Sequence, residues 1–406
     1  MLIANKTVAI IGGGPGGLTL ARLLQMKGAN VKVYERDLNK EVRVQGATLD
    51  LHEESGLKAL REAGLMDDFI ANYRPGAGRV RVVDKYAVII VDEHKQDKHV
   101  QEGYEQNRHE QVGYEHHELK ESRPEIDRGP LRNILLESLL PETVVWNSHF
   151  KSMTDGDEVN SNGWKIEFQN GSSAIANIVI AADGANSKVR PFITPIIPFF
   201  AGLTAIEGAV YDSKIAAPGI HSLLKGGKIF AFGDDKSLIV SAKGDGSLAF
   251  YAGCKTDEHW HKIHGVDFTN KAQVLSWFQK EFSGWDSVWC ELFEQASWPC
   301  MVRPQFCVPL DQVWEAQPNL TLLGDAAHLM PPYAGEGVNM AMLDALELSI
   351  CLLGNNFPSI QTAIAHYEQQ MRIRAAAAAS MTLDSMALLH SGDAITFMTS
   401  IIKQPE

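Results

Sequence analysis

A glycine string near the N-terminus constrains the fold of this chain most. Residues 12–17 read GGGPGG and follow an apolar run, 7–11, that predicts a β-strand. The string opens a run of good helix formers that ends at residue 27, and a second apolar strand, 31–34, leads to Glu35. This strand–helix–strand order is the context in which a G-x-G-x-x-G motif indicates a dinucleotide site.

Each part of the motif has a mechanical role. Gly12 makes the tight turn, Gly14 lets a pyrophosphate approach the backbone, and Gly17 lets the helix pack closely on the strand. The N–H groups at the helix start hold phosphates, and Glu35 can accept hydrogen bonds from ribose hydroxyls. An ordinary glycine-rich turn is the alternative, but the complete context favours the dinucleotide site.

Two further strings follow apolar strands. After 178–182 the chain reads DGANSKVR from Asp183, and after 320–323 it reads GDAAHLMPPYAGEGVN from Gly324. The second string places the Asp325 carboxylate at the C-terminal end of a strand and then opens a helix. Glycines at a helix start let a ligand approach the backbone, where free N–H groups suit an anionic oxygen.

With these strings the chain resembles the FAD-dependent group A aromatic-type monooxygenases. The fingerprints of that family are the dinucleotide glycines, D-G-x-x-S-x-x-R and G-D-A-A-H-x-x-x-P, and all three occur here in the same order. Within the family it is most similar to the tetracycline-inactivating monooxygenases. The matching runs are VAIIGGGPGGLTLARLLQMKG, VYERD, GATLDLH, LRNILLESL, GDAAHLMPPYAGEGVN and HYEQQM.

The resemblance implies an FAD site drawn from all three strings and the segments between them. Its expected residues are Gly12, Gly14, Pro15, Gly16, Gly17, Glu35, Arg36, Arg43, Asp50, Arg128, Arg132, Asp183, Asp325, Pro332, Gly335, Gly337, Val338 and Asn339. Asp325 would bind the ribityl hydroxyls, and Asn339 would hold the helix start. The N–H groups of Gly335 and Gly337 would face the pyrimidine edge of the flavin, where negative charge grows on reduction, and they are the predicted catalytic groups.

Several of these residues have plainer interpretations. Arg43 taken alone is a solvated surface charge, and Arg128 and Arg132 are either flavin-facing or surface charges beside acidic neighbours. His328 could be a catalytic base, but a histidine after a strand more often fixes a turn through its own hydrogen bonds.

The reaction implied by the resemblance is a hydroxylation. Because the chain has one dinucleotide fingerprint, NAD(P)H would visit transiently, reduce FAD and leave. Reduced flavin would react with O2 to form a C4a-hydroperoxide that hydroxylates a polycyclic or phenolic substrate. Arg36 and Arg43 favour NADPH over NADH. A reductase or oxidase on the same scaffold and a non-enzymatic FAD-binding sensor are the alternatives.

Tetracycline is one candidate substrate, and another aromatic metabolite is the alternative. The expected substrate residues are Glu207, Lys228 and Pro331. Glu207, Lys228, Ala249 and Ser385 occupy the positions at which tetracycline enzymes use polar side chains, and none is the residue expected there. Hydrogen-bonding groups set most of a pocket's discrimination, so the substrate stays open.

We predict an α/β fold: a Rossmann-like FAD-binding domain, an inserted substrate domain with a mixed or antiparallel sheet, and C-terminal helices. The FAD-binding domain would span 1–190, including a charged stretch at 94–122, and 319–356. The substrate domain would span 191–318, and helices would fill 357–406. The stretch 94–122 is rich in histidine but shows no ligand spacing, which favours a solvated loop over a metal site. Segments 79–83, 86–91, 174–181, 205–211, 228–232, 237–242 and 247–253 are predicted strands, and 53–64, 130–140, 272–282, 286–294 and 359–389 are predicted helices.

Composition excludes several other classes of protein. The formal net charge of −13 argues against nucleic acid as a partner, because a phosphate backbone demands a basic face. The five cysteines lack C-x-x-C spacing, which favours reduced thiols in the cytoplasm. The first strand begins too early for a signal peptide, and no apolar run reaches 18 residues, so we expect no membrane span. We expect a monomer that acts on a small molecule.

Overall fold

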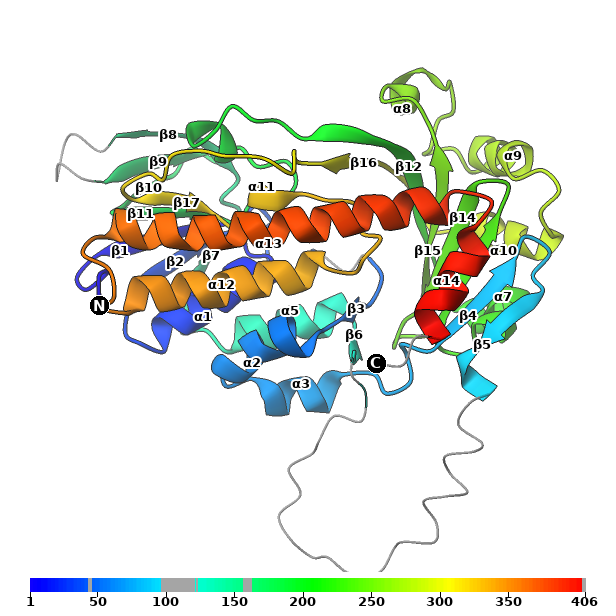
Figure 1. Ribbon diagram of the computed structural model, residues 1–406, viewed down its shortest axis with the longest axis horizontal. Coiled ribbons are helices and arrows are strands. Elements are labelled where there is room, and N and C mark those ends of the chain that lie inside the picture. The colour runs from blue at the N-terminus through cyan, green and yellow to red at the C-terminus, as the bar shows by residue number, and fades with distance from the viewer. Residues whose placement is uncertain (43–45, 96–120, 122, 156–162, 404–406) are drawn as a thin grey trace, which may run out of the picture.

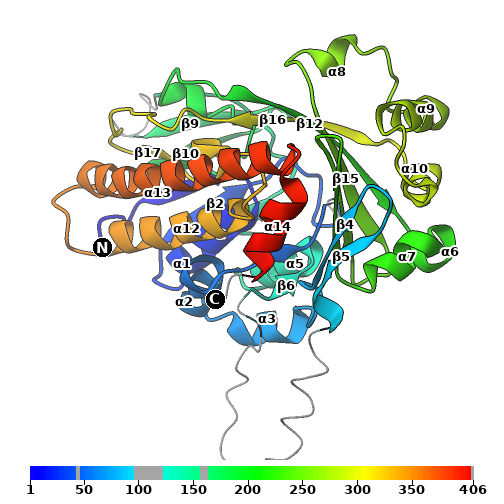
Figure 2. The ribbon, with the colours of Figure 1, turned by 45° about the vertical axis from the view of Figure 1, so that its right-hand side comes forward.

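The computed structural model describes all residues except 43–45, 96–120, 122, 156–162 and 404–406. Arg43 and nearly all of the charged stretch predicted at 94–122 therefore lie outside the described residues. The described residues form two sheet-containing lobes, and one long helix, α13, runs across both of them (Figures 1 and 2).

A five-stranded parallel sheet forms the first lobe. Its strand order is β17-β11-β1-β2-β7, with bounds Leu320–Leu322, Ile178–Ala181, Thr7–Ile11, Asn30–Tyr34 and Val144–Val145. In this register Ile10 of β1 lies between Ile180 of β11 and Val33 of β2. The predicted order of strand, helix and strand around the glycine string is confirmed, because α1 (Pro15–Gln25) connects β1 to β2.

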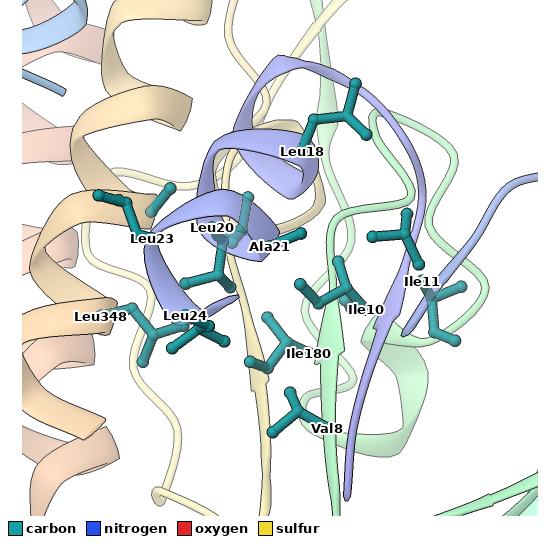
Figure 3. Close-up of a cluster of buried hydrophobic side chains, with 14 of the residues drawn as sticks. Val8, Ile10, Ile11, Leu18, Leu20, Ala21, Leu23, Leu24, Ile180 and Leu348 are labelled. Carbon is teal, nitrogen blue, oxygen red and sulfur yellow. The ribbon is translucent and has the colours of Figure 1, made fainter. Parts of the chain in front are cut away.

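Apolar side chains fill both faces of this sheet. Leu20, Leu24 and Ile180 are fully buried, and Figure 3 shows them between β1, α1 and α12 (Gly337–Leu353). The opposite face is covered by a three-stranded antiparallel sheet of β8 (Phe150–Asp155), β9 (Trp164–Phe168) and β10 (Ser173–Ala176). There the Phe168 ring stacks on Tyr34 with centroids 4.8 Å apart.

The strand predicted over 174–181 is two strands. Asn177 separates β10 from β11, and its side-chain oxygen accepts the backbone N–H of Thr7 at 2.9 Å. The apolar pattern runs through this point without a break, so the pattern alone could not show that the chain changes from one sheet to another.

A seven-stranded sheet forms the second lobe. Its order is β16-β12-β15-β14-β13-β4-β5, with bounds Met301–Cys307, Phe199–Val210, Leu248–Lys255, Lys236–Ala242, Lys228–Gly233, Val80–Asp84 and Ile89–Asp92. Only the β13–β4 pair is parallel. The buried cluster on one face includes residues of α7 (Pro218–Leu224), α9 (Lys271–Glu281) and α10 (Cys290–Glu294), and α14 (Ala394–Lys403) contributes to the cluster with β4 and β13.

The second lobe differs from the sequence prediction in two ways. Strands β4 and β5 belong to this sheet, although their place in the chain put them inside the predicted 1–190 domain. Strand β16 was not predicted, and it contains Pro304, which lacks the N–H that a central strand needs. The structure puts β16 at the sheet edge, where a proline is tolerated.

The remaining elements are short. Strands β3 (Leu49–Asp50) and β6 (Glu125–Ile126) pair antiparallel. The predicted helix over 53–64 begins as a π-helical turn, Glu53–Leu57, before α2 (Lys58–Glu62). The other helices are α3 (Met66–Asn72), α5 (Arg128–Glu137), α6 (Ser213–Ala216), α8 (Trp260–Ile263) and α11 (Asp325–His328), with short 3-10 turns at Glu93–Lys95, Arg190–Phe192 and Ser287–Trp289.

The predicted helix over 359–389 is confirmed as α13, Ile360–Leu389. Ser359 and Thr362 form a capping box at its start, which explains the sharp beginning. Among the described helices, none combines the length and apolar character that crossing a bilayer requires.

Candidate functional site

The three sequence strings meet at the carboxyl edge of the parallel sheet. A Cβ added to Gly12 would lie 3.0 Å from the Asp183 Cα, which places the first string against the second. A Cβ on Gly16 would lie 2.8 Å from the Ala341 carbonyl oxygen, so α1 packs directly on the first turns of α12. Ligands of open α/β sheets bind at this edge.

The glycines of the first string have the different roles that the motif predicts. Gly12 has a φ of +111°, and a Cβ there would lie 2.2 Å from the Ala182 carbonyl oxygen. A Cβ on Gly17 would lie 2.2 Å from the Gly12 carbonyl oxygen. By contrast, among the described residues no atom beyond the immediate chain neighbours lies within 4 Å of the position of a Gly14 Cβ. Gly12 and Gly17 therefore serve close packing, whereas Gly14 borders open space.

Neither helix that begins at this edge is capped by a side chain. The N-cap residues of α1 and α12 are Gly14 and Glu336; neither makes a side-chain cap hydrogen bond, and neither helix has an acidic residue in its first turn. Elsewhere in the chain Ser359 caps α13 and Asn270 caps α9. The first backbone N–H groups of α1 and α12 are thus free to hold an anionic ligand.

Asp325 is exposed at the end of β17, and no described residue donates a hydrogen bond to its carboxylate. Although the side chain is open to solvent, the protein packed around the carboxyl desolvates it and raises its pKa, and the charges of His328 and Arg128 oppose the rise. A Cβ on Gly337 would lie 3.9 Å from Asp325 Oδ1, so the carboxylate and the α12 N-terminus face one space. A carboxylate so placed suits ligand hydroxyls.

Asp183 presents a second carboxylate to the same edge. Its Oδ2 accepts the N–H of Lys188 at 2.7 Å, while Oδ1 is buried and has no hydrogen-bond partner among the described residues. Burial raises the pKa of the Asp183 carboxyl. A buried oxygen of this kind normally has a partner, which fits a site completed by a bound ligand.

Glu35 and Arg36 follow β2 as predicted. The Glu35 side chain is buried and accepts the backbone N–H groups of Gly13 at 2.6 Å and Asp37 at 2.9 Å. The Glu35 carboxylate therefore holds the backbone of the glycine string in place. The Arg36 side chain is exposed.

The two arginines of α5 lie in different surroundings. Arg132 is buried, pairs with Asp37 at 3.0 Å and donates to the Lys40 carbonyl oxygen at 2.8 Å, so its guanidinium holds the loop after β2. Arg128 is exposed at the first residue of α5, and its Nε donates to the Ala47 carbonyl oxygen at 3.1 Å. The positive charge of Arg128 opposes the rise in the pKa of the Asp325 carboxyl.

Asn339 joins the start of α12 to the segment after β3. Its amide nitrogen donates to the carbonyl oxygens of Asp50 at 2.9 Å and Gly335 at 3.3 Å, and its amide oxygen accepts the N–H of His52 at 2.9 Å. Gly335 has a φ of +71°. These contacts agree with the expectation that Asn339 holds the helix start, and Val338 lies between it and Gly337.

His328 has a structural role. It is 1% exposed, and its Nε2 lies 2.6 Å from Asp344 Oδ2, which also accepts the Gly324 N–H at 2.9 Å. Burial alone would lower the pKa of His328, but the Asp344 carboxylate raises it. Arg374 of α13 contacts the other oxygen of Asp344 at 2.8 Å. These groups fasten the turn after β17, as the turn-fixing interpretation predicts.

Sequence reasoning missed the residue that joins the second and third strings. Arg190, the arginine of D-G-x-x-S-x-x-R, is buried and donates to the carbonyl oxygens of Ala326 at 3.1 Å and Ala327 at 2.8 Å. It also contacts Gln312 at 2.7 Å. The available signal was the arginine at a fixed distance from Asp183, but its partners are distant in sequence.

The predicted substrate residues are engaged in contacts within the protein. Glu207 on β12 accepts from Arg303 Nε at 2.8 Å and from the Tyr251 hydroxyl at 3.4 Å, and Lys228 pairs with Glu125. The Pro331 carbonyl oxygen accepts the Thr382 hydroxyl at 2.7 Å, and Pro332 beside it is exposed. Glu207 lines a small cavity whose wall also includes Gly46, Ala249, Trp298 and Met301. No group of His, Cys, Asp and Glu within the described part of the chain is arranged to hold a metal ion.

This combination of parallel sheet, glycine string and two uncapped helix starts defines a dinucleotide-binding fold, and comparison with known proteins gives the family. The sequence matches the FAD binding domain family over residues 5–380, and the chain belongs to that family. It is an FAD-dependent monooxygenase by this membership, as the sequence strings predict.

Two curated relatives and one solved structure illustrate the likeness. The monooxygenase asqM of Emericella nidulans is 26% identical over 389 residues, which cover 84% of this chain and 82% of that protein. The 6-hydroxynicotinate 3-monooxygenase of Pseudomonas fluorescens is 26% identical over 403 residues, covering 96% and 93%. The crystal structure of the tetracycline destructase Tet(55) has the same fold, with a TM-score of 0.74, 17% identity, and coverage of 99% of this chain and 96% of that one.

Proposed function

We propose that this chain hydroxylates an electron-rich carbon of an aromatic or polycyclic small molecule, using NAD(P)H, O2 and FAD held where the three strings meet. One observation carries the proposal: an unobstructed Gly14, the exposed Asp325 carboxylate and two uncapped helix N-termini lie at one edge of the parallel sheet. The family supplies the identity of the dinucleotide.

Each of these groups has a role in the proposed site. The N–H groups of the α1 start would hold the diphosphate, with Glu35 beside the ribose. Asp325 would accept hydrogen bonds from the ribityl hydroxyls. The N–H groups of Gly335 and Gly337 would stabilise negative charge at the pyrimidine edge, while Asn339 holds that segment in place.

Bound FAD would supply the transfer of electrons from NAD(P)H and the activation of O2. In the balanced reaction, NAD(P)H provides two electrons, one oxygen atom enters the substrate and the other leaves as water. The chain's own contribution is to orient the two ring systems and to exclude water from the space between the lobes.

We propose NADPH as the preferred reductant on the positive charge of Arg36 and Arg43, because a guanidinium can pair with the extra phosphate of NADPH. Stopped-flow reduction with NADPH and NADH tests this preference. An Arg36→Gln variant should lose the preference for NADPH and keep its rate with NADH.

Tetracycline stays one candidate among several substrates. Glu207 and Lys228 are the polar groups expected to face the substrate, and both already contact oppositely charged side chains. A substrate that uses them must replace or share those partners, which favours ligands with hydroxyl or amide groups over ligands with a single charged group. Tetracycline and 6-hydroxynicotinate represent a fused-ring and a single-ring candidate.

The test is turnover of the purified protein against a panel of fused-ring and phenolic compounds that includes both candidates. The expected result is NAD(P)H oxidation and O2 uptake that depend on the substrate, with a product heavier by one oxygen atom. NAD(P)H oxidation without any oxygenated product across the panel would favour a reductase or oxidase. Bound flavin that NAD(P)H reduces only very slowly would favour a sensor.

A further inference from the structure

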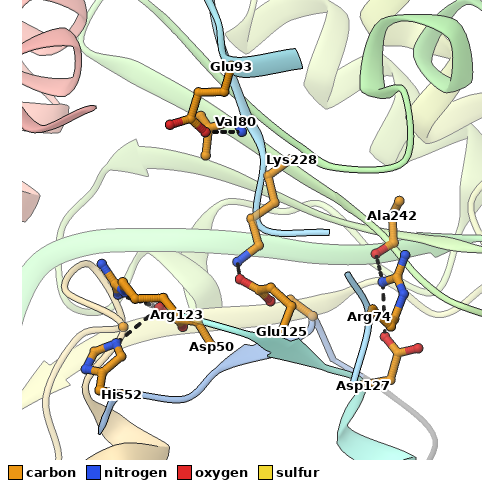
Figure 4. A network of polar contacts seen from close by, with 12 residues as sticks. Asp50, His52, Arg74, Val80, Glu93, Arg123, Glu125, Asp127, Lys228 and Ala242 are labelled. Carbon is orange, nitrogen blue, oxygen red and sulfur yellow. Dashed lines mark hydrogen bonds and ion pairs between the residues drawn. The ribbon is translucent and has the colours of Figure 1, made fainter. Parts of the chain in front are cut away.

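A cluster of charged side chains lies beside Gly335, between the short strands β3 and β6 and strand β13. Figure 4 shows Asp50, His52 and Arg123 on one side of this cluster and the Lys228–Glu125 pair next to them. Asp50 and Glu125 are opposite one another in the β3–β6 pair. Of these groups, Arg123 has no role in the site described above.

Arg123 and Asp50 lie against Gly335. The guanidinium of Arg123 contacts Asp50 Oδ2 directly, and His52 Nε2 contacts the same oxygen at 3.2 Å. A Cβ added to Gly335 would lie 3.2 Å from Arg123 Nη2 and 3.3 Å from each Asp50 carboxylate oxygen. The ion pair is therefore in van der Waals reach of the segment proposed to face the pyrimidine edge.

Asp50 is negatively charged in this position. Burial would raise the pKa of the carboxyl, but the hydrogen bond from His52 and the charges of Lys228 and Arg123 hold it well below its usual range. A fixed negative charge near the start of α12 opposes any further negative charge there, and reduced FAD carries more negative charge than oxidised FAD. The Arg123 guanidinium, which contacts Asp50 Oδ2, reduces this repulsion.

We propose that Arg123 sets the preference of the site for reduced over oxidised FAD by neutralising the Asp50 carboxylate beside Gly335. The proposal rests on the proposed FAD site. It gives Arg123 an electrostatic role toward the cofactor that the three sequence strings do not assign.

A plain surface ion pair is the competing explanation. The Arg123 side chain is 51% exposed, and pairs of exposed charges contribute little to stability. Arg61 provides a matched control, because its side chain is also 51% exposed and pairs with Glu53 at 2.7 Å. If Arg123 acts only as a surface charge, Arg123→Gln and Arg61→Gln will behave alike.

The experiment measures the midpoint potential of the FAD-loaded protein by dithionite titration against a reference dye. It also measures the dissociation constant of oxidised FAD by fluorescence. The variants are Arg123→Gln, Arg123→Lys, Asp50→Asn, the Arg123→Gln/Asp50→Asn double variant and Arg61→Gln. The ratio of the dissociation constants of reduced and oxidised FAD follows from the shift in potential.

We expect Arg123→Gln to raise that ratio roughly tenfold, which lowers the potential by about 30 mV for a two-electron couple. Asp50→Asn should shift the potential in the opposite direction. The double variant and Arg123→Lys should lie near the wild type, and Arg61→Gln should match it.

Equal potentials for Arg123→Gln and the wild type would overturn the proposal, as would shifts of the same sign for Arg123→Gln and Asp50→Asn. Loss of both FAD forms on Arg123→Gln would also overturn it, because Arg123 would then serve assembly of the site. These outcomes differ from failure of the proposed FAD site itself, in which the wild-type protein would bind no FAD at any concentration tested.

Discussion

The polar groups at the two sheets of this molecule differ in whether they have partners within the protein. At the edge of the parallel sheet, Asp325 and the first N–H groups of α1 and α12 have no partner among the described residues, and one oxygen of Asp183 is buried without one. On the seven-stranded sheet, Glu207 and Lys228 both contact oppositely charged side chains. The first region leaves polar groups available to a ligand. In the second region a ligand can use Glu207 and Lys228 only by replacing or sharing their present partners.

The largest expected effect comes from closing the open space at Gly14. Gly14→Val places a branched side chain where the described residues, apart from its chain neighbours, leave 4 Å of free space, so the protein should fold but bind FAD on the order of a hundredfold more weakly or not at all. Absorbance of the purified protein and FAD titration measure this. Gly392→Val is the control, because Gly392 also has no atom within 4 Å and lies far from the site in sequence. A fully yellow Gly14→Val protein would contradict the assignment.

Breaking the Lys228–Glu125 pair tests the second region. Lys228→Met leaves the 2% exposed Glu125 side chain without its cation, which should lower the free energy of unfolding by about 3 kcal/mol. Adding Glu125→Gln should recover much of the loss. Chemical denaturation of the three proteins measures both changes. An unchanged unfolding midpoint for Lys228→Met would contradict a stabilising role of the pair.

Removing the exposed carboxylate tests the first region without changing its packing. Asp325→Ala should weaken FAD binding by roughly ten- to a hundredfold, because hydrogen bonds to a charged group contribute about 1.5–3 kcal/mol. Stability should change little, since no described residue donates to that carboxylate. Asp311→Ala is the control, because Asp311 is also exposed. An Asp325→Ala protein that keeps wild-type FAD affinity would remove Asp325 from the site.

Two buried histidines should make the stability of the protein depend on pH in opposite directions. Burial lowers the pKa of His390 to about 4, so its unfolded form binds more protons between pH 4 and 6.5 and stability falls as the pH falls through that window. From pH 7 to 5 this loss is about 2 kcal/mol. The pKa of His328 is raised, so its contribution is complete below pH 6.5 and is lost as the pH rises above it.

Denaturation of His390→Gln and His328→Gln across this pH range separates the two effects. His390→Gln should flatten the acid side of the stability profile, and His328→Gln should flatten the side above pH 6.5. Ser237→Ala serves as a control, because it removes the contact between Ser237 Oγ and His390 Nε2 at 2.9 Å but keeps the imidazole. The same profile for all three variants would contradict the assignment.

The first region was the more predictable one for a physical reason. Gly12 and Gly17 are required by contacts of 2.2 Å within a short strand–helix unit, so the sequence alone carries the information. The turn after β17 was only partly predictable. His328 was expected to fix it, but the partners Asp344 and Arg374 lie on two later helices.

The second region was less predictable because its pairings join distant parts of the chain. Strand β4 pairs with β13, about 150 residues later, and no local pattern encodes that choice. The same holds for Lys228, whose partner Glu125 lies on β6. The alternation of apolar and polar residues predicted the strands of this sheet except β16. Which strands are neighbours, and which charged side chains pair, could be learned only from the structure.

Helix α13 links the two regions along its whole length. Near its start the Tyr367 hydroxyl donates to the Leu322 carbonyl oxygen, Thr382 holds Pro331, and His390 at its end contacts Ser237 of the far sheet. Thirty uninterrupted residues make a rod of about 45 Å. Because α13 contacts both lobes, it opposes a hinge motion that would separate them. We therefore expect a ligand to enter and leave through displacements of loops and side chains, and not through hinge opening of the two lobes.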